Sequence, residues 1–231
     1  MEQPIIITAE PTVKGRSSFL PRVYNWMTAG LALTAVVALF TASSPALQKV
    51  VFGNSIVFYG LIIAELGVVV ILSAAVRRLS AATATVLFLL YSALSGVTFA
   101  SIFLLYTSSS IASTFFVSAG TFGAMSLYGY TTKRDLTSWG SFFFMGLIGF
   151  ILATVANIWL HSEMIYWVTT YLGVLIFVGL TAYDTQKIKA IAHSGLSGED
   201  RQKAAILGAL ALYLDFINLF LMMLRLFGRR R

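Results

Sequence analysis

The chain has 231 residues, of which 58% are hydrophobic and only 11% carry a charge. A soluble domain usually has about 25% charged residues, and here the apolar residues form long runs between short polar breaks. The net charge of +7 lies in those breaks, not in a basic patch with interleaved aromatics, which argues against nucleic-acid binding. Cysteine is absent and only His161 and His193 could supply imidazole, so we expect no cofactor and no metal site of high affinity.

The chain order predicts a tail followed by one all-α membrane domain with seven transmembrane helices. Residues 1–21 hold three of the four prolines and are expected to be a flexible cytoplasmic tail; the apolar run after them is too long for a signal peptide. Residues 22–231 form the predicted domain, since each apolar run is long enough to cross about 30 Å of hydrocarbon as a helix. The predicted spans are 23–43, 55–76, 81–106, 111–131, 139–160, 164–188 and 204–227, and the longest internal break is 190–203.

The basic residues predict the orientation of these spans. Eleven lysines and arginines lie in the breaks on the side of the N-terminus, and only Lys49 lies on the other side when the C-terminal arginines are set aside. The positive-inside rule therefore places the N-terminus in the cytoplasm. Seven crossings would leave residues 229–231, "RRR", outside, against that rule. We still expect a full seventh crossing, because 204–227 is 24 mostly apolar residues long.

Few charged side chains remain inside the predicted spans: Glu65, Asp184, Asp215 and Arg225. Ionisable groups at membrane depth face the interior of the bundle, pair with one another, or mark a pathway. Asp215 belongs to a stripe of small and polar residues at helical spacing: Gly208, Ala211, Asn218, Met222 and Arg225. This face of the last helix is expected to pack against other helices, and a purely structural seam is one interpretation of it.

Asp184, in the segment "LTAYDTQK", has two interpretations. It can be a helix-end carboxylate paired with Lys187 at i+3. It can also meet Asp215 on the next helix, in which case repulsion and desolvation disfavour double ionisation and the pair shares one proton. Such a pair suits a proton sensor or a catalytic dyad.

Two further pairings are possible by depth in the membrane. At about 1.5 Å per residue, Glu65 and Arg225 both fall in the outer half of the membrane, where they could form a salt bridge. At the inner end of the second span, Arg77 or Arg78 is level with Asp184 and could neutralise it.

Two C-terminal segments carry a resemblance to a known family. The stretches "LTAYDTQKIKAIA" (180–192) and "ILGALALYLDFINLFLMMLRLFGRRR" (206–231) resemble the C-terminal signature of the Bax inhibitor-1, or transmembrane Bax-inhibitor-motif, family. The bacterial YccA/YbhL-type branch is the most similar. The number of spans, the length and the basic C-terminus agree, so the resemblance covers nearly everything after residue 21.

This resemblance implies a fold, a site and an activity. The seventh helix would be central and wrapped by the first six, in the bacterial inner membrane. Asp184 and Asp215 would form a pH-sensing dyad associated with a calcium leak. Glu65 and Arg225 match a latch-type ion pair, and either Arg77 or Arg78 matches an arginine that contacts the dyad. Some bacterial members are linked to modulation of a membrane AAA protease, which would make such a protease a partner.

Rival functions can be weighed on the same residues. An intramembrane aspartyl protease would also place Tyr-Asp on one helix, as in "AYD" (182–184), but it needs Gly-x-Gly-Asp on the next, where this chain has "LYLD" (212–215). A retinal receptor needs a lysine in the last span, and 204–227 contains none. The residues therefore favour a non-enzymatic membrane protein, in contact with the lipid bilayer, that conducts calcium or other cations or senses protons. A non-conducting regulatory protein is the alternative.

Overall fold

The computed structural model describes residues 18–76 and 78–231. The described residues form eight helices, and seven of these are long and apolar enough to cross a membrane. The prediction of an all-α membrane protein with seven spans is confirmed. The helices are α2 (Phe19–Ser43), α3 (Pro45–Phe52), α4 (Ser55–Ala75), α5 (Ala81–Leu105), α6 (Ser108–Thr131), α7 (Thr137–Leu160), α8 (Glu163–Ala192) and α9 (Gly198–Phe227).

Most of the helices extend beyond the predicted spans, because hydropathy marks only the apolar part of a helix, whereas α4 and α5 each end one residue earlier than predicted. Helix α2 begins at Phe19, so the last residues of the predicted tail are helical, and Pro21 is tolerated there in the first turn. Most of the predicted tail lies outside the described residues. The break predicted at 190–203 is much shorter in the structure, since α8 continues to Ala192 and α9 begins at Gly198.

Helix α3 was not predicted. Its eight residues are too few for a span, but local signals favour a helix. The hydroxyl of Ser44 accepts a hydrogen bond from Leu47 N, and Pro45 occupies the first turn, where its missing N–H costs nothing.

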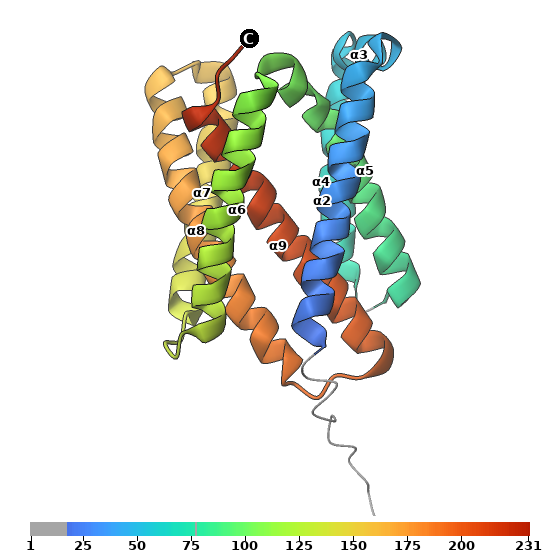
Figure 1. The fold of residues 1–231 in the computed structure, drawn as a ribbon, viewed down its shortest axis with the longest axis vertical. Coiled ribbons are helices and arrows are strands. Elements are labelled where there is room, and N and C mark those ends of the chain that lie inside the picture. Colours follow the sequence, from blue (N-terminus) through green and yellow to red (C-terminus); the bar gives the residue numbers. More distant parts are fainter. Residues whose placement is uncertain (1–17, 77) are drawn as a thin grey trace, which may run out of the picture.

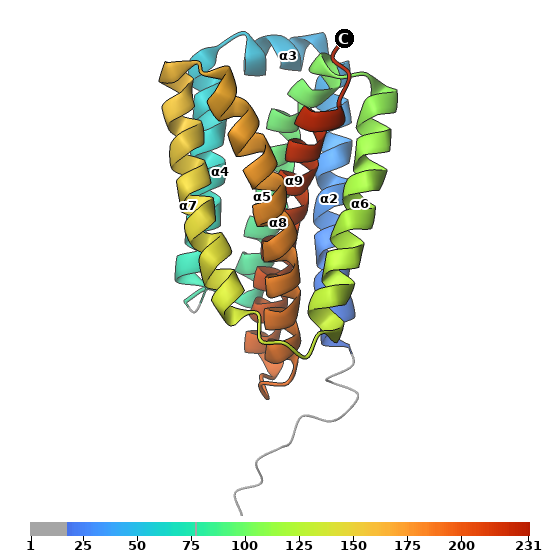
Figure 2. The same cartoon turned by 90° about the vertical axis from the view of Figure 1, so that its left-hand side faces the viewer.

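The spans form two groups with α9 running obliquely between them (Figure 1). Helices α2, α4 and α5 make one group, in which α5 packs against both α2 and α4. Helices α6, α7 and α8 make the other, in which α8 packs against both α6 and α7, and Figure 2 shows this group from its outer side. Helix α9 packs against α2, α5, α6 and α8 and is the most buried span, as expected for a central last helix. Helices α4 and α7 lie on the outside.

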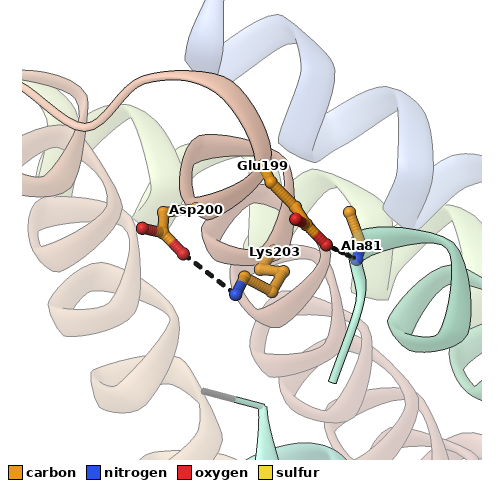
Figure 3. A network of polar contacts seen from close by, with 4 residues as sticks. All are labelled: Ala81, Glu199, Asp200 and Lys203. Atoms are coloured by element: carbon orange, nitrogen blue, oxygen red, sulfur yellow. Dashed lines mark hydrogen bonds and ion pairs between the residues drawn. The ribbon is translucent and has the colours of Figure 1, made fainter. Parts of the chain in front are cut away.

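Both ends of α9 are tied to the helices around it. At its start, Glu199 accepts a hydrogen bond of 2.7 Å from Ala81 N at the start of α5, and Lys203 pairs with Asp200 at 2.9 Å (Figure 3). The carboxylate of Glu199 therefore satisfies an N–H group that the first turn of α5 would otherwise leave unpaired.

The C-terminal arginines extend from the opposite end of α9. Thr107 N donates to Arg229 O and Arg231 N donates to Leu105 O, both at 3.0 Å, so the backbone of 229–231 pairs with the α5–α6 connection. The end of the chain and the start of α2 lie at opposite ends of the molecule (Figure 1). The seventh segment thus runs the full length of the bundle, as the predicted full crossing requires.

Candidate functional site

A cavity of about 990 Å³ lies among α4, α5, α7, α8 and α9. Most of its wall is hydrophobic or aromatic, and three carboxyl groups from three helices also line it: Glu65 from α4, Asp184 from α8 and Asp215 from α9. These are all three of the acidic residues that the sequence places inside spans. A single apolar cavity therefore collects every carboxyl group predicted at membrane depth.

The structure brings Asp184 and Asp215 together. Their carboxyl groups line the same cavity and interact electrostatically across the α8–α9 interface. Asp215 is only 4% exposed, and its Oδ2 is buried without a hydrogen-bond partner. Because an ionised carboxylate can only accept, a hydrogen bond between two carboxyl groups requires one of them to hold a proton. Two carboxyl groups that meet in this way can share one proton.

Close packing on both sides of α8 fixes the position of Asp184. Gly129 on α6 faces the backbone of Ala182, and a methyl group there would overlap the carbonyl oxygen of Ala182. On the α7 side, Gly140 faces the ring of Tyr183 in the same way. Two glycines thus let α6 and α7 approach α8 directly before the residue that carries the carboxyl group.

Among the described residues, the basic residue that interacts with Asp184 is Lys187. It is one turn away on α8, it lines the same cavity, and it interacts electrostatically with Asp184. The predicted contact with an arginine is not made by Arg78, which is exposed. Helix α4 ends at Ala75, so Arg78 lies in the turn beyond the helix and off the face that lines the cavity. Arg77 lies outside the described residues.

The predicted ion pair between Glu65 and Arg225 is not formed. The carboxylate of Glu65 accepts hydrogen bonds from two hydroxyl groups of α5, Thr98 at 3.0 Å and Ser95 at 3.4 Å. The guanidinium of Arg225 lies over the ring of Tyr166, 5.4 Å from its centroid. The two residues share a depth, but α4 packs mainly on α5 and does not reach the face of α9 that carries Arg225.

The small and polar residues along one face of α9 do not all have the same surroundings. Ala211, Asp215 and Asn218 line the cavity, whereas Gly208 packs against Ile188 on α8. Asn218 donates its amide to Leu214 O at 2.8 Å within α9. The stripe is thus partly a helix contact and partly a cavity wall.

A buried group of hydroxyl side chains on the other face of α9 was missed by the sequence reasoning. The hydroxyl of Tyr213 lies 2.7 Å from Thr34 Oγ1, and Thr34 also lies 2.8 Å from Ser92 O. Since Thr34 gives its one proton to a carbonyl oxygen, Tyr213 is the donor between the two hydroxyls. The sequence did offer a signal for a polar helix face. Tyr91, Ser95 and Thr98 on α5 are spaced at i, i+4 and i+7, which places their hydroxyl groups on one side of the helix.

The part of the chain that the structure describes contains no group of three or more metal-ligating side chains. Glu65 and the aspartate pair share a cavity without forming one coordination shell. Calcium bound tightly in proteins takes six to eight oxygen ligands, and the cavity presents its carboxyl groups at separate points instead.

Comparison with known proteins agrees with this architecture. A family model described as "Inhibitor of apoptosis-promoting Bax1" matches residues 16–231. The chain is 56% identical over 219 residues to the "Inner membrane protein YbhL" of Escherichia coli strain K12, covering 94% of each chain. It is also 45% identical over 217 residues to an uncharacterized protein of Borreliella burgdorferi, again covering 94% of each. The similarity therefore includes every helix of the structure.

Proposed function

The chain belongs to the Bax inhibitor-1 family of membrane proteins, and we propose that it is a pH-sensitive cation leak in which Asp184 and Asp215 act as a proton switch. It is an integral protein of the inner membrane, as its relative from Escherichia coli is. Calcium is the first cation to test, since the resemblance described above implies a calcium leak.

The observation that carries the proposal is the meeting of two carboxyl groups from consecutive spans, Asp184 and Asp215, which line one cavity and interact with each other. With one shared proton, the pair carries one negative charge and holds α8 against α9. Without it, two carboxylates face each other, and two like charges about 4 Å apart repel by roughly 4 kcal/mol at the effective dielectric constant of a protein. That exceeds the roughly 1 kcal/mol of an ordinary hydrogen bond. Loss of the proton would therefore alter both the charge of the cavity wall and the contact between the two helices.

The proposal assigns no catalytic step to the pair. Leu212 and Leu214 occupy the positions where an intramembrane aspartyl protease needs glycine beside its second aspartate.

The test is calcium flux into dye-loaded proteoliposomes across a pH series. Asparagine has nearly the shape of aspartic acid but cannot ionise, so Asp184→Asn and Asp215→Asn should each abolish the same pH-dependent step. The double variant should be little worse than either single one, because residues that act as a unit are strongly non-additive. Asn218→Ala, in the same cavity wall, should leave the pH midpoint unchanged. Additive aspartate effects with an unshifted midpoint would refute the switch.

An impermeable protein at every pH would refute the leak and favour the regulatory alternative. In that case the interaction with a membrane protease becomes the activity to measure, and the aspartate variants should change stability alone.

A further inference from the structure

The cavity is far larger than a metal ion requires. Sites for small organic molecules are concavities of about 300–1,000 Å³ with mainly apolar and aromatic walls and a few polar groups. This cavity has a volume of about 990 Å³, and its wall includes Phe144, Phe150, Phe177 and Leu214 beside the carboxyl groups. Its size and wall chemistry fit an organic ligand.

The cavity opens sideways between α4 and α7. Leu66 on α4 and Phe144 and Met145 on α7 line it, yet they are 62%, 59% and 64% exposed. Helix α4 packs mainly on α5 and α7 packs on α8, without an extensive contact between α4 and α7. In a bilayer this opening faces hydrocarbon, so a ligand that dissolves in the membrane can reach the cavity directly.

Among the described residues that line the cavity, three side chains are acidic and one is basic. Its one lysine, Lys187, interacts with Asp184. Glu65 has hydroxyl donors only, and Asp215 Oδ2 is buried without a hydrogen-bond partner. Burying a carboxylate in apolar surroundings is costly unless a cation accompanies it. The cavity therefore presents negative groups that a cation would stabilise.

We propose that this cavity binds hydrophobic organic cations, such as quaternary ammonium or phosphonium ions with apolar substituents. They enter from the bilayer between α4 and α7 and place their charge between Glu65 and Asp215. The apolar body of the ligand fills the wall formed by Phe144 and Phe150, and the ring of Tyr91 next to Glu65 adds a cation–π surface. This activity goes beyond the ion leak and does not depend on whether the cavity conducts.

The binding test compares two ions of the same shape and opposite charge, tetraphenylphosphonium and tetraphenylborate, by equilibrium dialysis with the detergent-purified full chain. The phosphonium should bind saturably and at least tenfold more tightly than the borate. Glu65→Gln keeps the shape of the side chain and removes its charge, so it should weaken phosphonium binding at least tenfold. Glu163→Gln, at an exposed position outside the cavity, is the matched control and should bind as the parent does.

Equal binding of the two ions, or parental affinity in Glu65→Gln, would overturn the proposal. A second measurement covers the case in which Glu65→Gln does not fold. A photoactivatable phosphonium should label the parent protein on α4 and α7 around Leu66 and Met145, and excess tetraphenylphosphonium should prevent the labelling. Labelling confined to other helices would equally overturn the proposal. Neither measurement involves ion flux, so failure here is separate from failure of the leak.

Discussion

The closest approach between α6 and α8 predicts the effect of a single methyl group. Gly129→Ala would place a Cβ against the backbone of Ala182, overlapping its carbonyl oxygen and coming within 2.9 Å of its Cα. A helix backbone cannot rotate out of the way as a side chain can, so the two helices must separate. Gly123, on the same helix, provides the control, because a Cβ there meets nothing within 4 Å.

The magnitude follows from two opposing effects. Overpacking in a tight contact costs about 1–3 kcal/mol, and a clash with backbone belongs in the upper part of that range. Replacing glycine by alanine inside a helix returns about 1 kcal/mol of helix propensity. Gly129→Ala should thus lose about 1–2 kcal/mol of the free energy of unfolding, whereas Gly123→Ala should gain up to about 1 kcal/mol. The two variants should differ by about 2–3 kcal/mol, or on the order of 4–12 °C in Tm for a chain of this size.

Thermal unfolding of both variants in the same detergent measures the difference. The flux assay adds a second readout, since Asp184 follows Ala182 by two residues and moves with it. Gly129→Ala should shift the pH midpoint of any calcium leak, and Gly123→Ala should not. A Gly129→Ala protein as stable as Gly123→Ala would refute the close α6–α8 contact and the positioning of Asp184 that rests on it.

Two other substitutions test the contacts of α9. Tyr213→Phe removes one hydroxyl group and keeps the ring, while Thr34 retains its backbone acceptors. The free energy of unfolding should therefore fall by about 1 kcal/mol. A loss of 3 kcal/mol or more would show that the buried hydroxyl groups act as a larger network. Glu199→Ala leaves Ala81 N without its charged acceptor and should cost about 1.5–3 kcal/mol. Asp200→Ala removes an ion pair within α9 whose carboxylate side chain is 70% exposed, and should cost no more than about 1 kcal/mol. Equal effects of the two would refute the helix cap.

The sequence by itself determined the membrane fold and the seven spans. Lipid offers backbone groups no hydrogen-bond partner, so apolar length alone specifies helices that cross. The sequence also singled out Glu65, Asp184 and Asp215, because a carboxyl group at membrane depth is costly unless it faces the bundle interior or a partner. Hydropathy did not predict α3, because its eight residues are specified by a cap and a proline, which are local signals that hydropathy does not measure.

Only the tertiary structure decided which of these groups meet. Counting residues along a helix gives the depth of a side chain but not the direction in which it points around the bundle. Asp184 and Asp215 lie at the same depth and point toward each other, because α8 packs on α9. Glu65 and Arg225 lie at a similar depth but point in different directions. Glu65 therefore accepts hydrogen bonds from hydroxyl groups on α5, and Arg225 lies over the ring of Tyr166. The cavity between α4 and α7 is likewise invisible in the sequence, because it results from two outer helices that each pack against a different neighbour.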